Sequence, residues 1–279
     1  MTYMRKRKMA RLPEGAESPL KAAIEGRDKS VLDMATSAVQ HRQTMLAYQP
    51  VMQTQPPHQA AFYEGLVRVL DETGRIIPAR DFMPMVENTE IGRQLDVNAL
   101  DLGLRTLARN PGVRLSINMS ARSIGYKAWN RTLDKHLKND DTLGERLMLE
   151  INEASAMAVP ELVIDFMDRL QRYGIAFALD DFGAGETVFR HFRDFFFDAV
   201  KIDGQFVRGL HRNPDNQAVT RALIAVAKEF DMLIIASSVE DIQDAEMLSL
   251  MGVDCLQGYL FGAPTLRPPW IPDKKVQRA

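Results

Sequence analysis

Apolar and polar positions along the chain follow two alternating patterns. Short runs rich in β-branched and other apolar residues, such as MLAYQPVM and IAFALD, are typical of strands. Longer stretches with apolar residues three and four positions apart are typical of helices. The expected strands lie at residues 45–52, 59–70, 113–120, 147–151, 175–180, 199–203, 232–237 and 255–261. The expected helices lie at residues 30–43, 81–109, 128–138, 160–173, 216–230 and 241–250.

This alternation of strands and helices predicts an α/β fold with a closed, mostly parallel barrel. We expect one barrel domain over residues 44–266, followed by a C-terminal tail at 267–279. Residues 1–43 form a basic N-terminal extension that we expect to be partly disordered up to about residue 28 and to end in a helix.

Composition and charge narrow the class of protein. The chain has 279 residues, 46% hydrophobic and 26% charged, with a net charge of −2, which gives no reason to expect binding to DNA or RNA. Cys255 is the single cysteine, so an internal disulfide is excluded and a reducing compartment is expected. The sequence has no apolar run long enough for a membrane span and no secretory signal, which predicts a cytoplasmic protein.

Polar residues stand at or near the carboxyl ends of most of the expected strands. They are Glu64, Asn118, Glu150, Asp180, Asp181, Lys201, Ser237 and Gln257. In a parallel barrel these ends gather at one mouth, where the active site of such barrels lies. Each residue alone has a structural explanation, such as a helix cap or a salt bridge. As a set, the carboxylates would repel one another and require a cation, and oxygen ligands favour Mg²⁺ or Mn²⁺ over Zn²⁺.

Asp180 and Asp181 are adjacent at the end of a buried strand. Two neighbouring carboxylates are able to serve two neighbouring ions, with Asp180 bridging the ions and Asp181 binding the second. A pair of ions of this kind activates water and binds a phosphoryl group. The sequence therefore predicts metal-assisted phosphoryl chemistry at the mouth.

Six segments resemble the EAL domain family of cyclic di-GMP phosphodiesterases. In chain order they are YEGLVR, SINMS, LEINE, DDFGAG, VKIDG and LQGYLFG, and the resemblance covers about residues 44–266. It implies a TIM-like (β/α)8 barrel with one antiparallel strand, in which two Mg²⁺ or Mn²⁺ ions open cyclic di-GMP to linear pGpG. A homodimer and a protein partner are also compatible with the family.

The resemblance also implies roles for individual residues. Glu64, Asn118, Glu150 and Asp180 are expected to bind the first ion, and Asp180 with Asp181 the second. Lys201 is expected to orient the attacking water. The residues expected to bind the substrate are Gln49, Leu66, Arg68, Asp203 and Gln257.

One position departs from the family pattern. The family usually carries Ala-Glu-Gly-Val-Glu after the seventh strand, whereas this chain reads ASSVE, so Ser237 replaces a glutamate expected to bind the second ion or act as base. A serine hydroxyl is a poor ligand for a hard cation and no base near neutral pH. Two functions therefore remain open: a phosphodiesterase with weak or lost hydrolysis, or a non-catalytic domain that senses cyclic di-GMP or contacts another protein.

Overall fold

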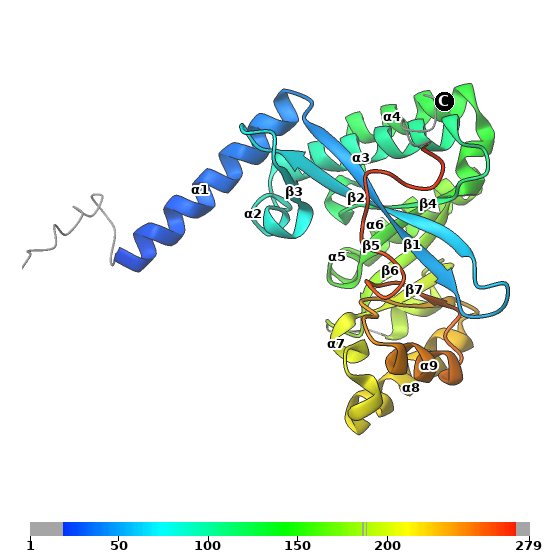
Figure 1. Ribbon diagram of the computed structural model, residues 1–279. Helices are drawn as coiled ribbons and strands as arrows, with labels where there is room; N and C mark the ends of the chain where they lie inside the picture. The colour runs from blue at the N-terminus through cyan, green and yellow to red at the C-terminus, as the bar shows by residue number, and fades with distance from the viewer. Residues whose placement is uncertain (1–18, 186, 188, 272–279) are drawn as a thin grey trace, which may run out of the picture.

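A closed barrel of strands forms the centre of the computed structural model, which describes residues 19–185, 187 and 189–271 (Figure 1). The strand order is β1-β9-β8-β7-β6-β5-β4-β2-β3, and pairing of β1 with β2 closes the ring, so that β3 lies outside it on β2. The strands are β1 Thr44–Gln53, β2 Ala60–Leu70, β3 Ile76–Pro78, β4 Leu115–Asn118, β5 Leu147–Asn152, β6 Ala176–Phe182, β7 Ala199–Ile202, β8 Leu233–Ala236 and β9 Cys255–Leu256.

The ring is parallel except for one strand. From β2 through β4 to β9 all neighbouring ring strands pair in parallel, whereas β1 is antiparallel to both β2 and β9. The predicted α/β barrel with one antiparallel strand is confirmed. Because seven strands of the ring run the same way, their carboxyl ends meet at one mouth.

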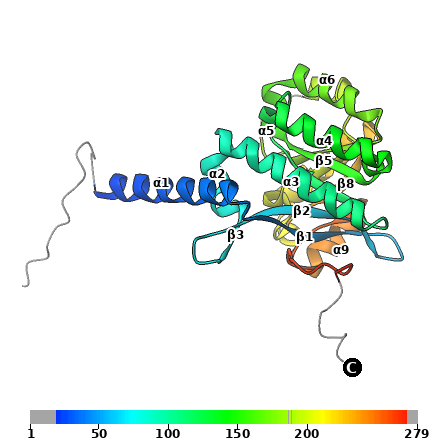
Figure 2. The ribbon, with the colours of Figure 1, turned by 90° about the horizontal axis from the view of Figure 1, so that it is seen from above.

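Helices surround the barrel, as Figure 2 shows from above. The α-helices are α1 Pro19–Gln40, α2 Met83–Val86, α3 Glu90–Arg109, α4 Lys127–Asn139, α5 Glu153–Ala158, α6 Pro160–Gln171, α7 Gly204–Val207, α8 Pro214–Glu229 and α9 Ile242–Met251. Short 3₁₀ helices are η1 Ala79–Asp81, η2 Ala121–Ser123, η3 Asp141–Arg146, η4 Phe189–Arg193 and η5 Leu210–Arg212. No helix within the described residues is both long enough and apolar enough to cross a membrane.

The core has one layer outside the strands and one inside the barrel. The outer layer joins helices to strands through fully buried side chains such as Leu104, Trp129 and Phe166. The inner layer consists mainly of small or β-branched side chains, among them Val51, Ala178, Ala199 and Ile235. Small residues fit the barrel interior because inward-facing side chains from several strands share that space.

Helix α1 projects away from the barrel and joins it through its carboxyl-terminal end (Figure 1). Ala35 and Ala38 of this end are fully buried in a separate cluster that includes Val69, Phe82 and Leu95. Alanine at these two positions allows the helix to lie close to β2, α2 and α3. The cluster therefore attaches the projecting helix to the rim of the barrel.

The structure corrects several predicted boundaries. The first helix begins at Pro19 rather than near residue 30, so residues 19–28 are helical. Proline is favoured at the first position of a helix, because its missing amide has no intrahelical partner there. Residues 1–18, which include the basic N-terminus, lie outside the described residues, as do 272–279 of the predicted tail.

The predicted helix over residues 81–109 is wrong in extent. It is divided into η1, α2 and α3, because the Thr89 hydroxyl accepts a hydrogen bond from the Ile91 amide and starts a new helix. Helix α5 and strand β3 were not expected from the pattern, since both are too short to show a period. The last predicted strand, 255–261, is only two residues long, and a turn follows it.

Candidate functional site

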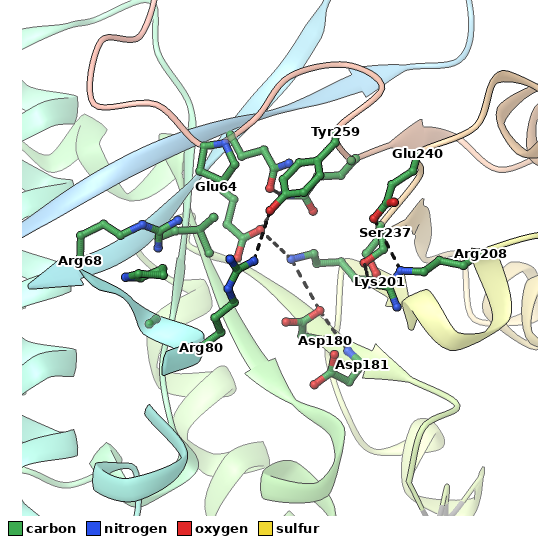
Figure 3. Close-up of a pocket in the computed structure, with 18 residues that line it drawn as sticks. Glu64, Arg68, Arg80, Asp180, Asp181, Lys201, Arg208, Ser237, Glu240 and Tyr259 are labelled. Atoms are coloured by element: carbon green, nitrogen blue, oxygen red, sulfur yellow. Dashed lines mark hydrogen bonds and ion pairs between the residues drawn. The ribbon is translucent and has the colours of Figure 1, made fainter. Parts of the chain in front are cut away.

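An open pocket of about 380 Å³ lies at the mouth of the barrel, where the carboxyl ends of the parallel strands meet (Figure 3). It is lined by residues of β1, β2, β6 and β7 and of the segments that follow β3, α7, β8 and β9. They include Gln49, Glu64, Leu66, Arg68, Arg80, Asp180, Asp181, Lys201, Arg208, Ser237, Ser238, Glu240, Gln257 and Tyr259. Four of these are acids and four are bases, so the pocket surface mixes both charges.

Lys201 is the buried centre of the charged residues. From β7 its Nζ lies 2.6 Å from Glu150 Oε2, 3.1 Å from Glu64 Oε2 and 3.5 Å from Asp180 Oδ1. The lysine and glutamate side chains are at most 7% exposed, and Asp180 is 20% exposed. These acids lie together, as the sequence predicted, and the Lys201 ammonium group lies at the point where they converge.

Glu64 is held by three side chains from three different strands or loops. Its Oε1 accepts a hydrogen bond from Asn118 Nδ2 at 2.6 Å, and its Oε2 accepts one from Gln257 Nε2 at 2.5 Å, besides the contact with Lys201. Gln257 in turn lies 3.4 Å from Gln49 Oε1. This network fixes the Glu64 carboxylate in one orientation at the floor of the pocket.

The pKa values of the three acids and of Lys201 are shifted because a single cation lies among three carboxylates. Burial alone would raise the pKa of Glu64, but Lys201 and the hydrogen bonds outweigh burial and lower it. Burial and the charge of Glu64 raise the pKa of Glu150 to about 8, and burial raises that of Asp180. The three carboxylates together outweigh burial and raise the pKa of Lys201 well above its ordinary value. One ammonium group does not fully compensate three buried carboxylates.

Asp181 differs from Asp180 in backbone and surroundings. Its φ of 56° lies in the left-handed region, and its carboxylate accepts a hydrogen bond from Asn152 Nδ2. Burial and the neighbouring charges of Asp180 and Asp203 raise its pKa to about 6. The left-handed turn is uncommon for a residue with a side chain, and it directs the two adjacent carboxylates to different partners.

Ser237 lines the pocket after β8, but it contributes no charge there. Its Oγ donates a hydrogen bond to the carbonyl oxygen of Ile202 at 2.8 Å. A hydroxyl in this arrangement is neither a base nor a strong ligand of a hard cation. Position 237 therefore contributes no carboxylate, and Glu240 is the acid of this segment that lines the pocket.

The donor chemistry of the floor fits a divalent cation. Oxygens of Glu64, Glu150, Asp180 and Asn118 lie there, and among the described residues Glu150 Oε1 is buried without a hydrogen-bond partner. Such oxygens suit Mg²⁺ or Mn²⁺, and a further cation would satisfy the unpaired oxygen. As the side chains stand, no group of three or more His, Cys, Asp and Glu residues within 19–185, 187 and 189–271 is arranged to hold a metal ion, because the acids surround Lys201.

The remaining predicted site residues divide into two groups. Leu66 and Arg68 of β2 line the pocket. Asp203 does not line it, and its carboxylate instead accepts a hydrogen bond from the Gln205 amide at the start of α7. Asn118 and Glu150 lie behind the lining residues and contact the pocket through Glu64 and Lys201.

The sequence reasoning missed a set of residues that shape the site. The buried Glu153 accepts hydrogen bonds from Gly183 N at 3.2 Å, Gly185 N at 3.1 Å and Thr187 Oγ1 at 2.5 Å. It thereby holds the turn that follows the two aspartates. Its place three residues after Glu150 in LEINE was the only signal available.

Arg80, Arg208 and Tyr259 also line the pocket and were not predicted. They come from segments that follow β3, α7 and β9, which lie far apart in the sequence. No spacing rule connects such positions, so they could be found only in the folded chain.

A barrel with one reversed strand and an acid-rich mouth built around a buried lysine defines a class of α/β domain, and comparison with known families identifies it. The EAL domain family model matches residues 32–264, and the chain belongs to this family. The resemblance seen in the sequence is confirmed.

Two relatives illustrate the similarity. Cyclic di-GMP phosphodiesterase PdeB of Shewanella oneidensis is 26% identical over 231 residues, which cover 81% of this chain and 27% of the relative. Cyclic di-GMP phosphodiesterase PA2567 of Pseudomonas aeruginosa is 30% identical over 226 residues, which cover 79% of this chain and 38% of the relative. The chain thus corresponds to less than half of either relative's length.

Solved structures show the same architecture. The PaMucR phosphodiesterase in complex with c-di-GMP superposes with a TM-score of 0.73 at 25% identity, covering 85% of this chain and 97% of that one. The FimX EAL domain from Pseudomonas aeruginosa bound to c-di-GMP, at 24% identity, has a TM-score of 0.76 and covers 84% of this chain and 96% of that one. The second likeness supports the fold alone.

Proposed function

We propose that this domain binds cyclic di-GMP in the pocket at the barrel mouth and hydrolyses it slowly to linear pGpG. The observation that carries the proposal is the convergence of Glu64, Glu150 and Asp180 on Lys201, directly below a pocket that also contains arginines. The names of the relatives, cyclic di-GMP phosphodiesterases, agree with this ligand.

In the proposed site the acids and the amide would hold Mg²⁺ or Mn²⁺. The first-ion residues are Glu64, Asn118, Glu150 and Asp180, and Asp181 with Asp180 would hold a second ion. When bound, such ions polarise the phosphodiester and lower the pKa of water. Gln49, Leu66, Arg68 and Gln257 would position the nucleotide, while Asp203 would act through the start of α7 rather than by contact.

In this reaction Lys201 provides a charged donor, whereas position 237 provides no base. Lys201 keeps a proton at Nζ, because the surrounding carboxylates raise its pKa, so it acts as a cationic donor that orients water or a phosphoryl oxygen. Ser237 holds no negative charge and provides no base. Loss of one charged group that stabilises the transition state costs about 10²–10³ in rate, which is the reason that we propose slow hydrolysis.

A specific observation favours the second candidate, a receptor without hydrolysis. Ser237 Oγ donates its hydrogen to the Ile202 carbonyl oxygen, so position 237 provides no carboxylate ligand for a second ion. The ligand-binding residues of the floor do not depend on Ser237. Binding without turnover is therefore the alternative that an experiment must separate from slow turnover.

Incubation of the purified protein with cyclic di-GMP and Mn²⁺, followed by nucleotide chromatography, tests the proposal. We expect slow formation of linear pGpG, which the Glu64→Ala substitution abolishes and the matched Glu161→Ala substitution, at an exposed position of α6, leaves unchanged. Binding measured by calorimetry without any product establishes the receptor. Absence of both binding and product contradicts the proposed function.

A further inference from the structure

The basic side chains of the pocket differ in how many contacts they make with acidic groups of the protein. Lys201 contacts three carboxylates and is buried, so its positive charge is already shared among these acids. Arg68, Arg80 and Arg208 also line the pocket. Figure 3 shows Arg80 and Arg208 on different sides of the pocket, with Lys201, Asp180 and Asp181 between them.

Arg80 reaches the pocket from η1, the turn that follows β3. Its Nη1 donates to Tyr259 Oη at 3.3 Å, and its Nε lies 3.7 Å from Asp81 Oδ1. The side chain is 74% exposed. Both contacts are long and engage only part of the guanidinium group, which has five N–H donors, so most of its donors face solvent at the mouth.

Arg208 reaches the pocket from the segment after α7. Its Nη2 donates to Ser238 Oγ at 3.0 Å, and its Nε lies 3.7 Å from Glu240 Oε1, while the side chain remains 58% exposed. The guanidinium therefore also keeps free donors. Its neighbours Ser238 and Glu240 belong to the same segment as Ser237, so Arg208 provides positive charge on the wall that lacks a carboxylate at 237.

The backbone next to Arg208 is held in place by hydrogen bonds to α9. Asp244 of α9 is buried and accepts hydrogen bonds from Gly209 N and His211 N, each at 2.8 Å, and lies 2.6 Å from His211 Nδ1. The turn after Arg208 is thus anchored to α9, whereas the guanidinium is not. Because the backbone is already fixed, binding of a ligand by Arg208 would order the side chain alone.

The charge of the pocket explains why these arginines matter. Its lining has four acids and four bases, and the buried Glu150 stands behind them. A cyclic dinucleotide adds two negative phosphodiester groups. Since Lys201 is already shared among the acids, the ligand needs other cations, and guanidinium groups bind phosphate oxygens through paired N–H donors.

We propose that Arg80 and Arg208 are specificity-determining residues that bind the phosphodiester groups of the ligand from different sides of the pocket. This inference rests on the proposed function, because it takes the ligand to be a cyclic dinucleotide. It assigns to two arginines a share of the affinity that does not depend on divalent ions.

The test is titration of the full chain with fluorescently labelled cyclic di-GMP in EDTA and again in Mg²⁺, followed by anisotropy. We expect Arg80→Ala and Arg208→Ala each to weaken binding in EDTA about tenfold, and the double variant about a hundredfold. Lysine at either position should restore part of the loss, because it keeps the charge but not the paired donors. The matched controls Arg75→Ala and Arg221→Ala, exposed arginines that do not line the pocket, should bind as the wild type does.

The outcomes separate the two proposals. If the wild type binds and the double variant binds equally well, the role of the arginines is wrong and the proposed ligand stands. If the wild type does not bind under either condition, both proposals are overturned. Thermal unfolding of each variant checks the fold, and Arg208→Gln, which retains a donor for Ser238, should lose affinity without loosening the turn.

Discussion

At the scale of single residues, the Lys201 ammonium group offsets the energetic cost of burying the acids at the barrel mouth. Its ammonium group lies within 3.5 Å of three carboxylates, two of them in nearly fully buried side chains. A charge buried without a partner is costly, so removal of this cation should affect stability as well as function.

We predict that Lys201→Met lowers the free energy of unfolding by about 3–5 kcal/mol at pH 8, since Glu64 and Glu150 would be left buried without their cation. Urea unfolding measures this change. The matched substitution Lys135→Met, on an exposed site of α4, should change it by less than about 0.5 kcal/mol. Equal stabilities of the two variants would contradict the role given to Lys201.

Ser237 is the residue at which the site departs from its expected chemistry. A glutamate there would place a carboxylate at position 237, which now has only a hydroxyl bonded to the Ile202 carbonyl. We predict that Ser237→Glu raises the rate of pGpG formation in Mn²⁺ by about 10²-fold, measured by nucleotide chromatography. Ser30→Glu, exposed on α1, is the control. No gain in a folded variant would show that hydrolysis is limited elsewhere.

At the scale of elements, Asp96 ties α3 to the segment that follows β4. Its Oδ2 accepts hydrogen bonds from Ser123 Oγ at 2.6 Å and Ser120 N at 3.1 Å. Burial raises the pKa of Asp96 to about 7. Because the folded-state pKa is raised, the folded protein holds a proton that the unfolded chain has already lost between about pH 4 and 7.

As the pH rises from about 4 to about 7, this group therefore lowers the free energy of unfolding by about 1.4 kcal/mol for each pH unit. Above about pH 7 the loss levels off. Asp96→Asn keeps the two acceptor contacts and removes the titration. We predict that the stability of the variant relative to the wild type increases from pH 5 to pH 7 and then levels off, as measured by urea unfolding. If the unfolding free energies of the variant and the wild type change with pH in the same way, the prediction for Asp96 is wrong.

Glu153 connects the start of α5 with the turn after β6. It accepts hydrogen bonds from Gly183, Gly185 and Thr187, so this turn depends on one buried carboxylate. We predict that Glu153→Ala accelerates amide hydrogen exchange at residues 183 and 185 by at least about tenfold, because local opening no longer breaks these bonds. Unchanged exchange there would contradict it, and exposed Glu161→Ala is the control.

The elements also show how far sequence reasoning extends. Strands such as β1 and β6 could be predicted, because buried strands form continuous apolar runs with recognisable ends. The acids at their ends could be grouped, because parallel strands end at one mouth. The division near Thr89 depends on a local helix cap, which the apolar periodicity does not show. The shortness of β9 is not visible in its apolar run, and the position of Arg80 depends on a contact with a distant segment.

At the scale of the whole molecule, the domain combines an EAL barrel with a helix that projects from its rim (Figure 1). The pocket opens at the mouth of the barrel, while α1 is attached beside it through β2, α2 and α3. The chain covers 27% and 38% of the two relatives described above, so the activity of a longer protein is not implied by the barrel alone.

The central claim is that this pocket binds cyclic di-GMP, and calorimetric titration of the nucleotide in Mg²⁺ tests it most directly. We predict saturable binding of one cyclic dinucleotide per chain, weakened at least about tenfold by Arg68→Ala or Gln257→Ala, since both side chains line the pocket. Absence of binding by the wild type, or full affinity in both variants, would contradict the account.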